Sequence, residues 1–243
     1  MYKRQQQVLE SAEKVKDIAQ AGGNNLIEPI RIGIIYTIGP YLLPHLIPIL
    51  REQVPEMPII VEEGFTSELR TKLKQGSLDA IIVSNPFQES GLITQILYHE
   101  PMVVVTPISH PLSQKKNIKS TELEEETVLL LGRGNCFRDQ VLEVCPGCLK
   151  AKDEDDVQKT LEGGSIETIR HMVASGVGVT VLPCTAAGAE EYSRRLLSIK
   201  RFSDIKPYRQ GILAWRKGYP RTKAIEALGE AIHSCPMTCV EMI

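Results

Sequence analysis

Apolar positions repeat with two different periods along the chain, and the two periods alternate. Short aliphatic runs, such as 30–35, 79–83 and 102–105, are typical of buried strands. Segments with an apolar residue every three or four positions, such as 66–76 and 222–233, predict helices. Further strands are expected at 59–61, 127–131, 157–161, 177–182, 196–199 and 208–215, and further helices at 41–54, from 136, and at 165–175. The alternation indicates an α/β fold with largely parallel sheets.

The first 21 residues differ from the rest of the chain. Val8, Ala12, Val15 and Ala19 repeat at helical spacing among Lys and Glu residues, and the Gly/Asn segment 22–25 is expected to end this helix. The narrow apolar stripe favours a linker or pairing helix, and a helix lying on its own domain is the alternative. The chain contains neither a run of about 18 apolar residues nor the apolar core of a signal peptide, so we expect a cytoplasmic protein.

Composition and charge exclude several classes of protein. The 243 residues are 42% hydrophobic and 24% charged, which excludes a disordered or collagen-like chain. Lys and Arg number 28 against 30 Asp and Glu, so the net charge of −2 gives no overall electrostatic affinity for nucleic acid. At roughly 100–200 residues per domain, the length allows one large domain or two small ones.

The candidate chemistry lies in the cysteines, of which there are six. In a reducing cytoplasm, clustered cysteines are redox-active or bind metal, and scattered ones fill the core. Asn135 is a good N-cap for a helix that places Cys136 in its first turn, where backbone N–H groups favour an anion, and Arg133 and Arg138 can add to this effect. A thiolate at Cys136 is suited to attack on a peroxide O–O bond, which gives a sulfenic acid.

Cys145 lies nine positions after Cys136, which is about 13.5 Å along the axis of a regular helix. A disulfide needs Cα atoms within about 7 Å, so these two cysteines can bond only if the helix unwinds. Two other interpretations stay open. Both residues can be ordinary core cysteines, or Cys145 and Cys148 can form a C-x-x-C redox dithiol or half of a zinc site. No second half is present, so we expect no metal, and we expect Cys184 to serve packing.

Three sequence motifs together resemble the hydrogen-peroxide-sensing branch of the LysR-type transcription regulators. They are IGPYLLPH at 38–45, CFRDQ at 136–140 with a second cysteine after eight residues, and SIETIRHMVASG at 165–176. The resemblance extends over about residues 1–233. It implies two Rossmann-like subdomains of the periplasmic-binding-protein type, with the chain crossing twice between them. We expect a linker helix at 1–28, regulatory subdomain I at 29–101 plus 209–243, and subdomain II with the redox cysteines at 102–208.

The same resemblance implies roles for individual residues. Cys136 corresponds to the peroxidatic cysteine, Cys145 to the resolving cysteine and Asp139 to an aspartate involved in activation. The expected peroxide pocket consists of Thr37, Thr66, Gly134 and Asn135. The family often has His at position 135; the amide of Asn135 can hold a peroxide oxygen but cannot shuttle a proton. Cys148 is an extra thiol that can compete with Cys145.

The function that the resemblance implies is redox-controlled transcription, without enzymatic activity or a cofactor. Hydrogen peroxide would be the signal, and the winged helix-turn-helix that binds promoter DNA is expected to be absent from this chain. The other expected partners are RNA polymerase, a thiol reductant of the glutaredoxin or thioredoxin type, and copies of the chain, in a homodimer of regulatory domains or a homotetramer of the full-length protein. Two alternatives are a regulator that binds a small effector reversibly between its subdomains, and a thiol peroxidase.

Overall fold

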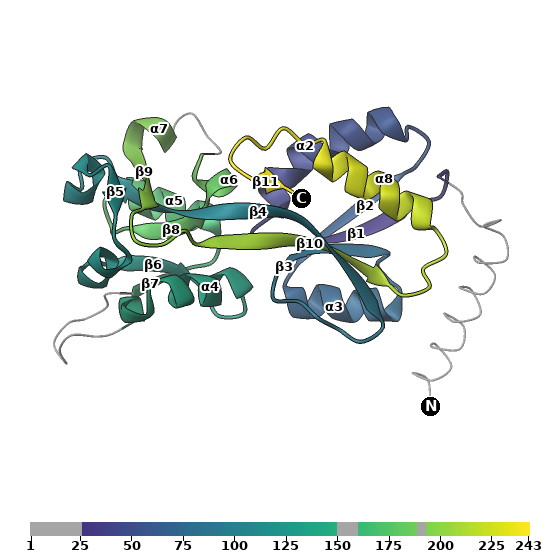
Figure 1. Ribbon diagram of the computed structural model, residues 1–243, viewed down its shortest axis with the longest axis horizontal. Coiled ribbons are helices and arrows are strands. Elements are labelled where there is room, and N and C mark those ends of the chain that lie inside the picture. The colour runs from purple at the N-terminus through teal and green to yellow at the C-terminus, as the bar shows by residue number, and fades with distance from the viewer. Residues whose placement is uncertain (1–25, 150–159, 189–192) are drawn as a thin grey trace.

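The computed structural model describes residues 26–149, 160–188 and 193–243 (Figure 1). The helix predicted over residues 1–21 lies outside this part of the chain. The strands are β1 Ile30–Ile35, β2 Ile59–Gly64, β3 Ala80–Ser84, β4 Leu92–Pro107, β5 Asn117–Ile118, β6 Val128–Leu131, β7 Thr160–Gly163, β8 Thr180–Pro183, β9 Leu197–Phe202, β10 Tyr208–Arg216 and β11 Glu241–Met242. The helices are α2 Gly39–Gln53, α3 Thr66–Gln75, α4 Cys136–Val144, α5 Ile166–Ala174, α6 Cys184–Ala187, α7 Ser193–Leu196 and α8 Thr222–His233.

Short 3₁₀ helices join several of these elements. They are η1 Pro111–Gln114, η2 Ser120–Glu125 and η3 Pro146–Leu149. Among the described residues, no helix has both the length and the apolar character that crossing a membrane requires.

The α/β architecture agrees with the prediction, but the sheet is mixed, whereas the pattern of strands and helices predicts largely parallel pairing. Strands β1, β2 and β3 pair in parallel, as do β6 and β7. The long strands β4 and β10 are antiparallel to each other, and β10 is also antiparallel to β3. β8 and β9 both pair antiparallel with the second half of β4. The alternation predicted most of the strands and helices, but not β5, β11, α6, α7 or the first half of β4. It also carries no information about the direction in which a long crossing strand runs.

Buried side chains form two hydrophobic clusters, one at each end of the pair β4–β10 (Figure 1). The first core contains aliphatic residues of β1, β3, α2 and α8, and includes Leu97 and Tyr98 from β4. The second core contains residues of β6, α4, α5 and β8, and includes Val103–Val105 from the other half of β4. β4 therefore supplies side chains to both cores. We keep 29–101 plus 209–243 and 102–208 as the proposed division into subdomains.

Candidate functional site

A small cavity lies where the two cores meet, and the predicted pocket residues line it. Thr37, Thr66, Gly134, Asn135 and Cys136 all contribute to its wall. Its volume is about 10 Å³, which is about the space that one water molecule requires. The cavity therefore has the size of a very small polar molecule.

The fold explains why residues so distant in sequence meet here. Thr37 follows β1 and Thr66 begins α3 after β2, and the parallel pairing of β1 with β2 places both at the same edge of the sheet. Cys136 is the first residue of α4, which reaches the cavity from the second core. The carboxyl edge of parallel strands is where open α/β sheets commonly bind ligands.

Cys136 is a free, half-buried cysteine. The hydroxyl of Thr66 donates a weak hydrogen bond to its Sγ at 3.9 Å. Asn135 occupies the N-cap position, as predicted, but its side chain makes no capping hydrogen bond. Instead, its Nδ2 donates to the Gly132 carbonyl at 3.0 Å and thereby closes the turn that leads into the helix. Gly134 has a φ of +94° in this turn, a conformation that favours glycine.

The arginines expected to assist Cys136 are engaged elsewhere or exposed. Arg138 is buried and donates to the Leu131 carbonyl at 2.9 Å, and it forms a 2.9 Å ion pair with Glu162. Arg133 is exposed to solvent. Neither belongs to the residues that line the cavity.

A different cation, Arg209 of β10, contacts the wall of the cavity through Thr37 without lining the cavity itself, and the sequence did not predict it. It donates to the Thr37 hydroxyl at 3.0 Å and to the Thr37 carbonyl at 2.8 Å, and its Nε donates to Glu100 at 2.7 Å. Its guanidinium also lies 5.3 Å from the ring centroid of Phe137, the residue after Cys136. A charged residue of opposite sign in each of two long strands is the signal that could have found this pair, because such residues are rarely buried without a partner.

The electrostatic setting keeps Arg209 charged. Burial by itself lowers the pKa of this guanidinium, but the Glu100 carboxylate, with smaller contributions from Tyr98 and Cys136, raises it above its ordinary value. A permanent positive charge therefore lies next to the Thr37 hydroxyl in the wall of the cavity. Preorganised donors of this kind stabilise negative charge that develops during a reaction.

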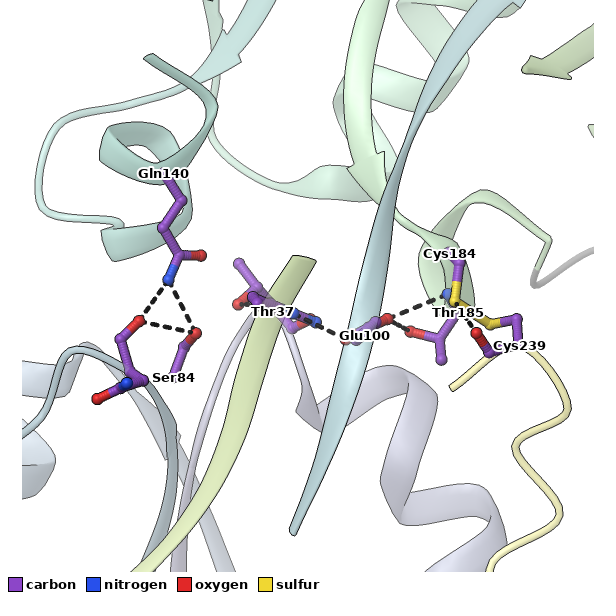
Figure 2. A network of polar contacts seen from close by, with 9 residues as sticks. Thr37, Ser84, Glu100, Gln140, Cys184, Thr185 and Cys239 are labelled. Atoms are coloured by element: carbon purple, nitrogen blue, oxygen red, sulfur yellow. Dashed lines mark hydrogen bonds and ion pairs between the residues drawn. A yellow bond between two sulfur atoms is a disulfide. The ribbon is translucent and has the colours of Figure 1, made fainter. Parts of the chain in front are cut away.

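Helix α4 is attached to both cores. The Gln140 side chain donates to the Ser84 hydroxyl at 3.0 Å and to the Asn85 carbonyl at 2.6 Å, both at the end of β3 (Figure 2). Phe137 and Val141 face the second core, and each is only 2% exposed. Unwinding α4 would therefore break polar contacts to the first core and remove apolar groups from the second.

The remaining predicted residues have different surroundings. Asp139 is exposed in the first turn of α4 and does not line the cavity, so its role stays a prediction. Cys145 is the C-cap residue of α4 and is only 1% exposed. Because α4 is a regular helix between the two cysteines, Cys136 and Cys145 stand about 13.5 Å apart along its axis. Their role as a redox pair also stays a prediction.

The structure pairs four of the six cysteines. Cys145 is bonded to Cys148, with Cα atoms 5.5 Å apart. Cys184 is bonded to Cys239, with Cα atoms 6.1 Å apart, so the expectation that Cys184 serves only packing is wrong. The sequence did not predict this second pair because 55 positions separate the two residues, and no local pattern connects them. Within the described residues, no group of three or more His, Cys, Asp or Glu side chains is arranged to hold a metal ion.

Comparison with known proteins shows similarity to one family over most of the chain. The model of the LysR substrate binding domain matches residues 24–234. The DNA-binding transcriptional dual regulator OxyR of Escherichia coli K12 is 34% identical over 229 residues, which cover 93% of this chain and 72% of that protein.

Solved structures agree with this similarity. A full-length OxyR variant from Pseudomonas aeruginosa is 47% identical with a TM-score of 0.82, over 95% of this chain and 73% of that one. An OxyR mutant from Corynebacterium glutamicum, described as H₂O₂-bound, is 27% identical with a TM-score of 0.76, over 93% of this chain and 71% of that one. The names of these relatives describe regulators of transcription, and none describes an enzyme.

Proposed function

Because the chain belongs to the LysR substrate-binding-domain family and its relatives there are OxyR proteins, we propose that it is the hydrogen-peroxide-sensing regulatory domain of a transcription factor. The observation that carries this proposal is the position of Cys136. Its sulfur lies beside a cavity of about 10 Å³ whose wall includes two threonines, one of them held by Arg209. A related structure that contains hydrogen peroxide supports the choice of ligand.

The first chemical step is attack of the Cys136 thiolate on one peroxide oxygen. The O–O bond breaks, Cys136 becomes a sulfenic acid, and the other oxygen leaves as hydroxide, which takes up a proton to become water. Thr37 and Thr66 line the cavity, and we expect them to hydrogen-bond the bound oxygens; Arg209, which donates to Thr37, would orient it and add positive charge. Removing one donor from a preorganised site of this kind typically costs about 10²–10³ in rate.

In the second step, the Cys145 thiol attacks the sulfenic sulfur of Cys136, and water leaves as their disulfide forms. The separation of about 13.5 Å requires α4 to unwind first. Phe137 and Val141 then leave the second core, and each fully buried side chain of this size contributes about 1.5–3 kcal/mol. These apolar groups are expected to repack elsewhere on the second subdomain or on a neighbouring copy, which changes the shape of the regulator.

The assembly and the partners belong to the same proposal. We expect a homodimer of regulatory domains whose interface changes on oxidation, and a homotetramer of the full-length protein. We expect the other partners to be promoter DNA, RNA polymerase and a thiol reductant of the glutaredoxin or thioredoxin type. We expect the protein to be cytoplasmic. The regulator is expected to react once with peroxide for each reduction, and not to act as an enzyme with many turnovers.

The test is the second-order rate of peroxide consumption by the fully reduced chain, followed by rapid quenching and mass spectrometry. Cys136→Ser should abolish the reaction, and Thr37→Val should slow it by about 10²–10³. Thr71→Val is the matched control, because Thr71 lies on the exposed face of α3, does not line the cavity, and donates its hydroxyl to the Ser67 carbonyl at 2.9 Å. Asn135→His should change the rate less than Thr37→Val, because the amide already supplies a donor.

Three results would contradict the proposal. If Thr37→Val reacted like Thr71→Val, the pocket would be wrongly assigned. A transcriptional response that survives Cys136→Ser in the full-length protein would favour a reversibly bound effector. Many peroxide turnovers per chain with a dithiol donor would favour a thiol peroxidase.

A further inference from the structure

The disulfide between Cys145 and Cys148 has a consequence for the proposed sensor. It lies at the C-terminal end of α4, and the helix is intact from Cys136 to Val144 while this bond is present. Cys136 is free in the same structure. A bond between Cys145 and Cys148 is therefore compatible with the folded helix, whereas a bond between Cys136 and Cys145 requires it to unwind.

We propose, on the basis of the proposed function, that Cys148 ends the peroxide signal by taking over the disulfide. Peroxide first oxidises Cys136, and Cys145 captures the sulfenic acid, as described above. The Cys148 thiolate then attacks the Sγ of Cys145, the bond between Cys136 and Cys145 breaks, and Cys136 leaves as a thiolate. One hydrogen peroxide has then converted the thiols of Cys145 and Cys148 into a disulfide and has become two waters.

Three features favour this exchange over a lasting Cys136–Cys145 bond. Cys148 is three positions from Cys145, so the attacking thiol is always near its target. The exchange lets α4 refold, which returns Phe137 and Val141 to the second core and Gln140 to Ser84. The leaving group is the thiolate of Cys136, which is the first residue of α4 once the helix has refolded, and backbone N–H groups at a helix N-terminus favour an anion.

All six cysteines lie in the described residues, so other resolving thiols can be judged directly. Cys235 belongs to the first core, and burial raises its pKa to about 11, so it is protonated and a poor nucleophile. Neither Cys184 nor Cys239 lines the cavity beside Cys136, and they form the second disulfide with each other. Cys148 is therefore the thiol that can compete with Cys136 for a bond to Cys145. In the proposed sensor, the state with α4 unwound would be transient. A dithiol reductant would be needed only to reduce the Cys145–Cys148 disulfide back to two thiols.

Trypsin separates the two possible products by mass. Cleavage after Arg133, Arg138 and Lys150 places Cys136 in one peptide and both Cys145 and Cys148 in the next. A bond from Cys136 to Cys145 joins the two peptides. A bond from Cys145 to Cys148 leaves them separate and makes the second peptide lighter by two hydrogen atoms.

The experiment gives the fully reduced chain one equivalent of peroxide and quenches samples with acid and a thiol-alkylating reagent over time. In the wild type, the joined peptides should appear first and then be replaced by the internally bonded peptide, with Cys136 alkylated. In Cys148→Ser, the joined peptides should persist at least about tenfold longer. Hydrogen exchange in α4 should recover its protection in the wild type but not in Cys148→Ser. Cys235→Ser is the matched control and should behave like the wild type.

The outcomes separate this relay from the function on which it rests. If the joined peptides persisted equally in the wild type and in Cys148→Ser, the relay would be wrong and the peroxide sensor would stand. If Cys136→Ser formed the Cys145–Cys148 bond as fast as the wild type, Cys136 would not be the reacting thiol, and the proposed function would fail.

A second inference comes from a different observation, the bond between Cys184 and Cys239, which joins the two cores. Cys184 begins α6, whose Ala186 and Ala187 are buried in the second core. Cys239 lies in the C-terminal segment, whose Met237 is buried in the first core. Cys239 is exposed, and both cysteines line a cavity of about 470 Å³, so a thiol reagent can reach the bond.

A continuous chain of contacts connects this bond to the peroxide cavity (Figure 2). Thr185, the neighbour of Cys184, donates its backbone N–H to Glu100 at 3.1 Å, and its hydroxyl donates to the same oxygen. Glu100 accepts from Arg209, and Arg209 donates to Thr37, as described above. From Thr185 to Thr37 every link is a hydrogen bond of a charged group, and Glu100 and Arg209 are almost completely buried.

The geometry points to a second redox site that sets the peroxide reactivity of the first. A dithiol reductant attacks the Sγ of the exposed residue Cys239, and Cys184 leaves as a thiolate. The second thiol of the reductant then releases Cys239, so the reductant becomes a disulfide. Without the bond, α6 is held less firmly against the first core, and Thr185 orients Glu100 less well. Arg209 then holds Thr37 less firmly, and Cys136 reacts more slowly with peroxide.

The test compares the initial rate of Cys136 oxidation by peroxide in chains that keep the Cys145–Cys148 bond, in which Cys136 is free. Cys239→Ser and Cys184→Ser should each slow the reaction by about 3- to 10-fold relative to the chain that retains the Cys184–Cys239 disulfide. Thr185→Val, which keeps the disulfide and removes one hydrogen bond to Glu100, should slow it in the same direction. Cys235→Ser, in the same C-terminal segment, should leave the rate unchanged. Equal rates in the wild type and Cys239→Ser would overturn the inference, as would slowing by Cys239→Ser together with an unchanged rate for Thr185→Val.

Discussion

The two disulfides of the described residues lie in opposite settings. The bond between Cys145 and Cys148 spans three positions, and both residues are buried in the second core. The bond between Cys184 and Cys239 spans 55 positions, and it joins two cores at an accessible surface. The first is therefore suited to exchange with a neighbouring cysteine, and the second to exchange with a reductant from outside.

The difference shows that sequence separation and burial decide what a cysteine pair can do. A local pair constrains one helix end and responds to the folding of α4. A long-range pair constrains the relative position of two cores and responds to the redox state of the surroundings. Arg209 and Glu100 connect Thr185, the neighbour of Cys184, to Thr37 in the wall of the cavity where α4 begins. Breaking this connection is therefore the strongest test.

The largest effect is expected from breaking the ion pair between Arg209 and Glu100. Both side chains are 1% exposed, and their Nε–Oε2 distance is 2.7 Å. Arg209→Met leaves a buried carboxylate without its charged partner, so the free energy of unfolding should fall by about 3–5 kcal/mol. Denaturant unfolding, with both disulfides verified intact, measures this. The double variant Arg209→Met/Glu100→Leu should recover most of the loss, and a single variant that lost under about 1 kcal/mol would show that the pair does not hold the two regions together.

Removing each disulfide should have unequal effects on stability. Chain-entropy arguments assign about 4 kcal/mol to a loop of about 55 residues and about 2 kcal/mol to a loop of about four residues. Cys239→Ser should therefore lower the free energy of unfolding more than Cys148→Ser, measured in the oxidised proteins. The control is to measure the same two variants under strong reductant, where neither disulfide is present. The difference between their free energies of unfolding should then be small. Equal losses under oxidising conditions would contradict the contrast between a local and a long-range bond.

The smallest effect concerns Cys235, which is neither bonded to a cysteine nor exposed. Burial raises the pKa of its thiol from an ordinary value of 9.0 to about 11. The unfolded chain therefore loses this proton at lower pH than the folded chain, and stability should fall as the pH rises from about 9 to about 11. Cys235→Ala should show a shallower decline over this range, measured by urea unfolding at several pH values. Identical slopes for the two proteins would show that Cys235 does not titrate differently in the folded state.

Much of the candidate site could be predicted because it depends on local signals. The motif around Cys136 placed this residue in the first turn of a helix, and the structure begins α4 there. The resemblance named Thr37, Thr66, Gly134 and Asn135, and the structure gathers them around one cavity. The contact of Arg209 with Thr37 could not be predicted, because a strand pattern does not indicate which buried side chain of a distant strand will face Thr37. Arg138 seemed the better candidate from sequence only because it is near Cys136 along the chain.

The sequence by itself determined the α/β alternation, the start of α4 and the nine-residue spacing that keeps Cys136 and Cys145 apart. These features depend on neighbours within a few positions, where side-chain periodicity and helix geometry act. Only the tertiary structure decided that β4 and β10 run antiparallel between two cores, that Cys184 meets Cys239, and that Arg209 joins Glu100 to Thr37. Each of these depends on how two long strands cross the molecule, and residues that meet after such a crossing share no local pattern along the chain.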